Sequence, residues 1–354
     1  MTINKSLIGG CALLVAVLLL VTQSFAGTGK RTGTAGALEL LIPVGSVGTA
    51  LGGADLANVA GIEAIHWNPA GLAASPDAAA VMVSHMKYIA DLNVNYVAGK
   101  FKPGNFGALG FSIKSIDFGN VAVTTNESPD GTGENFSPTF LTFGITYARA
   151  MTDRINFGIN VKGISEQIMR ETATGIAVDF GLQYMTGMGI GFGVAVKNLG
   201  PNMKFNGGDL EIFTKDISQR PDTEGENLRI PLQSFELPSS FEIGISYNHG
   251  MGEMNNLTIM GAFMNNNFAL DQYRVGAEYS YNNMVFLRGS YVLAYDSDAN
   301  KFRTTDESNF IWGPSFGGGV NLNLGKSMKF SFDYAYRVTR LFDNNQWFTL
   351  GFRF

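Results

Sequence analysis

The chain has 354 residues with Lys+Arg 25 against Asp+Glu 30, a formal net charge of −5. Charged residues make up 16%, against roughly 25% in ordinary soluble domains. A disordered chain would carry fewer aromatics and more charge, and a nucleic-acid-binding protein would carry a basic excess. Glycine is abundant, at 44 residues. This composition favours a glycine- and aromatic-rich β protein.

The first 26 residues are predicted to be a cleaved signal peptide. Lys5 supplies a positive start, residues 7–21 are apolar, and Ser24-Phe25-Ala26 offers small residues at the cleavage site. The single cysteine, Cys11, lies within this segment. The mature protein is therefore expected outside the cytoplasm and without disulfides. Residues 27–354 contain no run of 18 apolar residues, so the sequence predicts no transmembrane helix.

Residues 27–77 form a separate predicted segment, rich in glycine and alanine. Residues 51–65 are predicted to form a short helix with a small-residue face, and Asn68-Pro69 should end it because proline removes a backbone donor. About fifty residues are too many for a simple leader to the first strand. The segment is therefore expected to fold inward as a plug, or hatch.

From residue 78 to 354, apolar and polar residues alternate in segments of about ten residues, the length of a membrane-spanning strand. Phe241, Ile243 and Ile245, for example, alternate with Glu242 and Gly244. The predicted strands are 79–88, 91–101, 106–118, 138–150, 153–166, 174–186, 189–197, 239–248, 256–265, 271–281, 284–295, 313–324, 327–339 and 346–354.

The connections between these strands differ by parity. Every even-numbered connection is short, whereas the long ones, 119–137, 198–238 and 296–312, are all odd-numbered. An outer-membrane barrel with both chain ends in the periplasm has this pattern, and a soluble sandwich has no reason for it. The fold class is therefore predicted to be all-β: a 14-stranded antiparallel transmembrane β-barrel with a small N-terminal helical hatch, in the outer membrane of a Gram-negative bacterium.

The final strand ends on alternating apolar residues. In outer-membrane barrels such a strand is read by the barrel-assembly machinery, which is therefore an expected partner together with membrane lipid. The residues predicted to carry this signal are Phe348, Leu350, Phe352 and Phe354.

If the apolar face meets lipid, the charged residues of the strands face the lumen, because Lys or Arg at mid-bilayer would cost about 2–4 kcal/mol each. A solvated strand face is the alternative. An aromatic girdle is expected at Tyr88, Tyr96, Tyr295, Trp312, Trp347 and Phe348. The predicted lumen charges are Lys114, Lys162, Asp179, Glu242, Arg274, Glu278, Arg288, Asp333, Arg337 and Arg353.

Two stretches of the predicted hatch, 47–54 and 64–73, resemble the N-terminal signature of the PorV/PorQ family, within the wider FadL-like superfamily. The resemblance implies a fourteen-stranded barrel with an N-terminal hatch. The matching hatch residues are Gly52, Gly53, Trp67, Asn68, Pro69, Ala70 and Gly71. Asn68–Ala70 act either as a hinge that gates the lumen or as a turn that wedges the hatch against the wall.

The resemblance also implies a function: a type IX secretion component that binds secreted proteins through their C-terminal domains and carries them to surface attachment machinery. The alternatives are a FadL-like channel for hydrophobic small molecules and a structural barrel without transport. A β-bulge that breaks the wall would favour the channel. The long connection 198–238 is expected outside the cell, as a docking site or a solvated cap.

No enzymatic activity is predicted. The three histidines lack metal-ligand spacing, and the chain has no Gly-x-Ser-x-Gly elbow. The glycine-rich stretch 187–193 is not followed by a helical pattern, so it is interpreted as a hairpin rather than a nucleotide-binding loop. No catalytic residue, metal, cofactor or nucleic-acid partner is expected.

Overall fold

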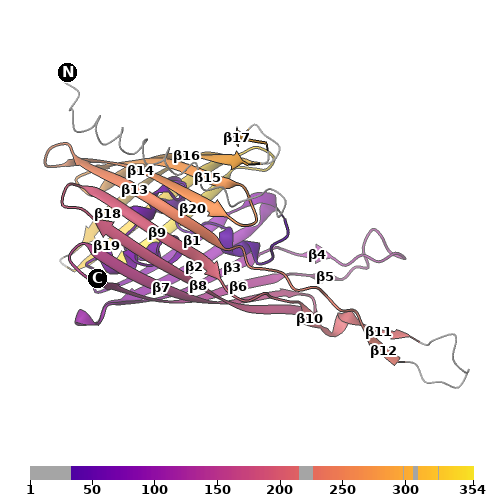
Figure 1. Cartoon of the computed structure of the whole chain (residues 1–354). Helices are drawn as coiled ribbons and strands as arrows, with labels where there is room; N and C mark the ends of the chain where they lie inside the picture. The colour runs from indigo at the N-terminus through magenta and orange to yellow at the C-terminus, as the bar shows by residue number, and fades with distance from the viewer. Residues whose placement is uncertain (1–32, 215–225, 298, 306–309, 326) are drawn as a thin grey trace, which may run out of the picture.

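The computed structural model describes residues 33–214, 226–297, 299–305, 310–325 and 327–354. The predicted signal peptide lies outside these residues. One antiparallel sheet closes on itself in sequence order, because β1 pairs with β20 and β8 with β9 (Figure 1). The sheet contains 16 strands, and without the short β10 and β17 fourteen form the wall, which confirms the predicted barrel.

The wall strands agree with the predicted segments to within a few residues, because the period-two alternation marks them directly. They are β1 (Ala79–Lys87), β2 (Asn93–Phe101), β3 (Ala108–Asp117), β6 (Thr139–Ala150), β7 (Ile155–Ile168), β8 (Glu171–Met185), β9 (Ile190–Leu199), β13 (Ser240–Gly250), β14 (Asn255–Asn266), β15 (Asp271–Tyr281), β16 (Val285–Asp296), β18 (Trp312–Leu324), β19 (Met328–Thr339) and β20 (Asn345–Arg353).

Shorter elements lie in the connections. They are η5 (Ile89–Asp91), η6 (Gly104–Phe106), β4 (Val121–Ala122), β5 (Asn135–Phe136), β10 (Asn206–Gly207), η7 (Gly208–Leu210), β11 (Glu211–Thr214), β12 (Glu226–Arg229) and β17 (Lys301–Arg303). The β4–β5 and β11–β12 hairpins extend from one end of the barrel, and the short turns lie at the other (Figure 1). The parity of the connections thus corresponds to the two ends of the barrel.

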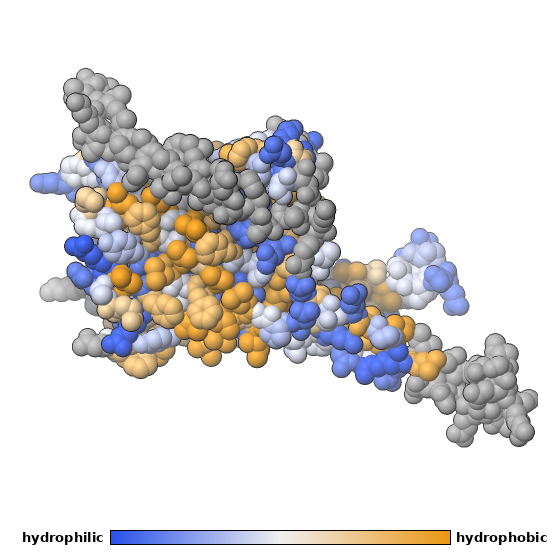
Figure 2. Space-filling model, viewed as in Figure 1, coloured by the Kyte–Doolittle hydropathy of each residue, from blue (hydrophilic) through white to orange (hydrophobic). Residues whose placement is uncertain are grey.

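The outer surface of the wall is apolar. On β3, exposed Leu109, Phe111 and Ile113 alternate with buried residues along the strand. Hydrophobic residues form a broad area across the wall in Figure 2, with hydrophilic residues near the ends. A barrel with this exterior can be solvated by lipid. None of the helices in the described part of the chain is long and apolar enough to cross a membrane.

Residues 33–77, called the hatch from here on, lie inside the barrel and pack against inward-facing side chains (Figure 1). Their elements are η3 (Leu38–Leu41), α2 (Ser46–Ala50), η4 (Ala54–Ala57), α3 (Ala64–Trp67) and α4 (Gly71–Ala74). The prediction of a helix over residues 51–65 is wrong. Gly52 and Gly53 have φ of 62° and 75°, a left-handed conformation that interrupts a right-handed helix.

The aromatic girdle is also partly wrong. Tyr96 and Trp347 are buried on the inner face, and Trp347 packs with Ile42 and Ala50 of the hatch. The strand register explains this, since Trp347 lies two residues from the buried Thr349, whereas Phe348 is exposed. These two rings therefore bind the hatch to the wall rather than facing the membrane surface.

Candidate functional site: the interface between hatch and wall

Two turns of the hatch are tied together by a buried carboxylate. Glu63 accepts hydrogen bonds from the backbone N–H groups of Val47 (3.2 Å) and Gly48 (2.8 Å). Burial without a cationic partner raises the pKa of Glu63 to about 8, and the charges of Asp333 and Asp55 act in the same direction. Trp67 adds a second link, because its indole N–H donates to Val44 O at 3.2 Å.

The Asn68–Ala70 turn is pressed against the wall at positions where the wall has glycine. Asn68 Nδ2 donates to Leu56 O within the hatch (2.9 Å) and to Leu182 O on β8 (3.3 Å), and Asn68 Oδ1 accepts from Ala70 N (3.2 Å). A Cβ at Gly181 would lie 2.1 Å from Asn68 Oδ1. One at Gly158 would lie 2.3 Å from the Pro69 carbonyl carbon. This geometry supports the wedge interpretation of the turn.

The other residues of the hatch signature are also tightly placed. Gly53 lies where a Cβ would be 2.6 Å from the Trp67 ring and 2.7 Å from Arg274 Nη1. A Cβ at Gly71 would be 2.1 Å from Val59 O. Gly52 faces Ser290 and Val292 of β16, and Ser290 Oγ donates to Ala50 O at 2.9 Å. The Gly52-Gly53 turn therefore lies directly behind β16.

At this position the wall is irregular. On one edge β16 pairs with β18 only from Val285 to Ser290, and with β17 from Ala294 to Asp296. Within the described residues, 291–293 have no ladder partner on that edge. On the other side of the gap, β18 shifts register against β19 between Trp312 and Ser315, where Gly313-Pro314 forms a bulge. Proline lacks the N–H that a ladder requires, so it is compatible with such an interruption.

The inner side of this interruption is apolar. Val292, Ala294 and Phe310 are buried together, with Leu270 and Trp312 packed against them. A Cβ at Gly52 would lie 3.1 Å from Val292 Cγ2, so this apolar layer lies next to the hatch. We call residues 291–293 and 312–315 the wall break.

Within the part of the wall that the structure describes, predicted lumen charges form ion pairs in three places on the inner face. Lys162 pairs with Asp179 (2.6 Å), Glu242 pairs with Lys197 (2.9 Å) and Arg274 (3.1 Å), and Arg288 pairs with Glu278 (2.6 Å) and Asp333 (2.7 Å). Sequence reasoning missed Lys197, although it is in phase with the inward-facing Gly191, Gly193 and Ala195 of β9. Charges of both signs thus lie side by side on the inner face.

The other three predicted lumen charges make hydrogen bonds or lie over aromatic rings, and the described residues include no salt bridge of theirs. Lys114 Nζ donates to Glu39 O of the hatch (2.6 Å), and Arg353 donates to Asn321 Oδ1 (2.8 Å). Arg337 donates to Ser315 Oγ (3.1 Å) and lies over the rings of Trp312 and Trp347. Arg337 therefore connects the wall break to β20.

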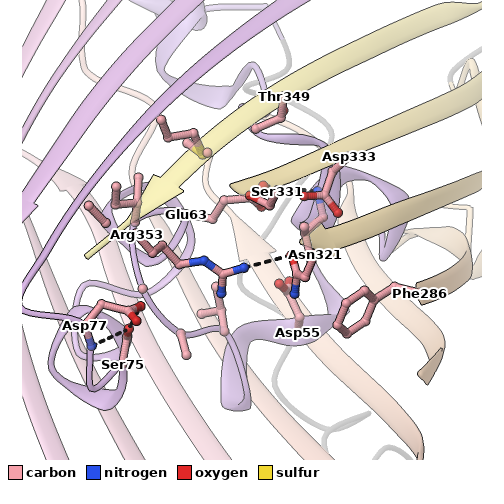
Figure 3. A pocket seen from close by; sticks show the side chains of 18 of the residues that line it. Asp55, Glu63, Ser75, Asp77, Phe286, Asn321, Ser331, Asp333, Thr349 and Arg353 are labelled. Atoms are coloured by element: carbon pink, nitrogen blue, oxygen red, sulfur yellow. Dashed lines mark hydrogen bonds between the residues drawn. The ribbon is translucent and has the colours of Figure 1, made fainter. Parts of the chain in front are cut away.

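A cavity of about 480 Å³ lies between the hatch and strands β14 to β16, β18 to β20 and β1, towards the end with the short turns. Asp55 and Glu63 face it from the hatch, and Asp333, Asn321 and Arg353 face it from the wall (Figure 3). Sequence reasoning missed Asp55 and Glu63 as site residues. The sequence does contain a signal for them, because charged residues are rare among the glycines and alanines of this segment.

The side chains of Phe348, Leu350, Phe352 and Phe354 are exposed on the outer face of the closing strand. Their role in barrel assembly stays a prediction. Among the residues that the structure describes, no group of three or more His, Cys, Asp or Glu side chains is arranged to hold a metal ion.

No family model matches the sequence, and no curated protein matches it. Among solved structures, the CymD monoaromatic hydrocarbon channel superposes with a TM-score of 0.54 at 12% identity, covering 88% of this chain and 97% of that chain. The Pseudomonas putida toluene transporter TodX superposes with a TM-score of 0.50 at 12% identity, covering 87% and 96%. The chain therefore shares the fold of these proteins, a closed 14-stranded antiparallel barrel of the Gram-negative outer membrane. These comparisons do not extend to the narrower PorV/PorQ resemblance.

Proposed function

We propose that the protein is an outer-membrane channel through which small hydrophobic molecules leave the lumen sideways. The observation that carries this proposal is the wall break with its apolar backing of Val292, Ala294 and Phe310. A β-bulge that breaks the wall favours a hydrophobic channel over a secretion barrel.

The position of the hatch supports the same conclusion. The two left-handed glycines, Gly52 and Gly53, form a turn immediately behind the break. A turn of this kind can change its backbone angles at little steric cost. A molecule that passes from the apolar layer into lipid stays out of water throughout, which favours hydrophobic solutes. The two similar structures are named a monoaromatic hydrocarbon channel and a toluene transporter, which agrees with this substrate class.

The type IX secretion role is supported by the resemblance over residues 45–75 alone. No feature of the described residues favours it over the channel. Extraction of the barrel with secreted proteins in fixed stoichiometry would reverse this preference.

Deletion of Pro314 tests the channel. It removes the extra residue of the bulge and leaves Trp312 opposite Thr339 and Ser315 opposite Arg337, so β18 can pair continuously. We expect the variant to form a heat-modifiable barrel and to lose uptake of radiolabelled toluene into cells that express it. Deletion of Pro129, in the connection between β4 and β5, is the matched control and should leave uptake unchanged. Undiminished uptake after deletion of Pro314 would contradict the sideways path, and wild-type cells no faster than cells without the protein would contradict the channel.

A further inference from the structure

The cavity between hatch and wall differs from a simple hydrophobic passage because two buried acids face it. Asp55 is 3% exposed and Glu63 is 8% exposed. Among the described residues, neither forms a salt bridge. Asp55 Oδ1 has no hydrogen-bond partner, and Glu63 is bonded to two backbone N–H groups. A buried carboxyl oxygen without a partner is costly, and a ligand with a positive charge would supply the missing interaction.

The other charges that line the cavity do not neutralise these acids. Arg288 is already shared between Glu278 and Asp333, and Arg353 is bonded to Asn321. Lys329 is exposed at the rim near the short turn that follows β18. The hatch side of the cavity is therefore acidic, and the exposed cation Lys329 lies at the opening.

Part of the remaining lining is apolar, while Asn58, Ser75, Asp77, Ser331 and Thr349 add polar groups. Leu51 and Val47 come from the hatch, and Met82, Met260 and Phe286 come from the wall. A volume of about 480 Å³ lies within the range of roughly 300–1,000 Å³ that is typical of small-molecule sites. A metal ion would not need this volume or this apolar surface.

We infer that the cavity binds a small amphiphilic amine, with its ammonium group at Asp55 and Glu63 and its apolar body against Leu51, Met260 and Phe286. This inference rests on the proposed function and refines it: the substrate class becomes hydrophobic amines, and hydrophobic carboxylates are disfavoured by the two acids. The ammonium group thus supplies the positive charge that Asp55 and Glu63 do not receive from the hatch itself.

The charged surroundings of Asp55 make binding pH-dependent. Lys197 on β9, Glu278 on β15 and Arg288 on β16 act on it, β14 presents Met260, and Glu242 on β13 is engaged by Lys197 and Arg274. Burial raises the pKa of Asp55 to about 7. The carboxyl is thus largely protonated at about pH 6 and ionised at about pH 8, so amine affinity should rise about tenfold between these values.

The experiment compares three probes with the same apolar body: phenylbutylamine, phenylbutanol and phenylbutyrate. Calorimetry on the purified barrel in detergent at about pH 8 should give an amine affinity at least about tenfold above that of the alcohol. Asp55→Asn is nearly isosteric and breaks no hydrogen bond of Asp55 Oδ1. It should abolish the preference for the amine over the alcohol. Asp343→Asn, an exposed carboxyl at the opposite rim, is the control and should bind like wild type.

Each outcome decides the inference. The inference is overturned if the barrel binds amine and alcohol equally well, or if the amine preference survives Asp55→Asn. Tighter binding of phenylbutyrate would also overturn it, because the ligand would then lie at Arg353 and Lys329. Toluene uptake measured in parallel separates this failure from failure of the channel. A barrel that carries toluene but does not prefer the amine keeps the proposed function and loses only the amine site.

Discussion

At Gly181 the wall has no side chain, and the amide oxygen of Asn68 occupies the space where a Cβ would be. The same holds at Gly158 for the Pro69 carbonyl. These wall residues account for part of the glycine content that first distinguished the sequence. At this interface glycine is required because the hatch approaches the wall backbone closely, and not because the chain turns there.

Substitution of Gly181 by valine should therefore loosen the hatch. The new side chain would collide with Asn68, and overpacking of this kind typically costs about 1–3 kcal/mol. We expect faster hydrogen–deuterium exchange in residues 64–73 while the wall strands keep their protection. Gly163→Val is the control, since a Cβ there meets nothing within 4 Å. Equal exchange in the two variants would show that the Asn68 contact does not hold the hatch.

Among the elements, the two long connections differ in how they are attached. In the described residues the β4–β5 and β11–β12 hairpins each pair only with themselves, but the connection that carries β11–β12 also contains β10. This short strand joins the wall sheet by pairing Asn206 with Thr172 and Gly207 with Glu171 of β8. A hairpin whose backbone hydrogen bonds are all internal can be removed without leaving unpaired backbone groups in the wall.

Deletion of residues 121–136 should accordingly leave barrel assembly intact. We expect the same heat-dependent shift in electrophoretic mobility as for wild type, and the same uptake of toluene. Deletion of Asn206 and Gly207 is the comparison, since it removes hydrogen bonds to β8 and should lower the unfolding temperature. Failure of the 121–136 deletion to assemble would assign this hairpin a structural role.

The elements also show what the sequence could predict. Strand number and closure follow from period-two alternation and from the parity of the connections, both local properties. The structure of the hatch does not follow from local properties. Gly52 and Gly53 interrupt the expected helix because they fit against Trp67 and β16. The cavity combines residues from Val47 to Arg353, and no local pattern connects positions so distant in the chain.

For the molecule as a whole, the buried acids of the hatch predict that its docking depends on pH. Burial raises the pKa of Asp55 to about 7 and of Glu63 to about 8, well above their values in an exposed chain. The docked state therefore binds more protons than the released one, so docking is most stable at low pH and weakens as the pH rises towards 8.

Hydrogen–deuterium exchange of residues 44–65 should therefore accelerate, after correction for the intrinsic rate, as the pH is raised from about 5 to about 9. Asp55→Asn should reduce this dependence, and Asp343→Asn should retain it. A flat profile in wild type would mean that the two acids stay ionised in the docked hatch.

The ion pairs of the wall have a consequence for how the molecule is assembled. Every buried salt bridge described above joins one strand to another, and in the described residues none joins strand to hatch. The hatch is instead attached by bonds such as Lys114 to Glu39 O, Gln183 to Val59 O and Thr349 to Ser46. The cylinder can thus neutralise its own charges as its strands pair, before residues 33–77 enter it. Closure of the barrel and insertion of the hatch are then separable steps. Salt screens charge pairs, so it should change neither the insertion of the hatch nor its release.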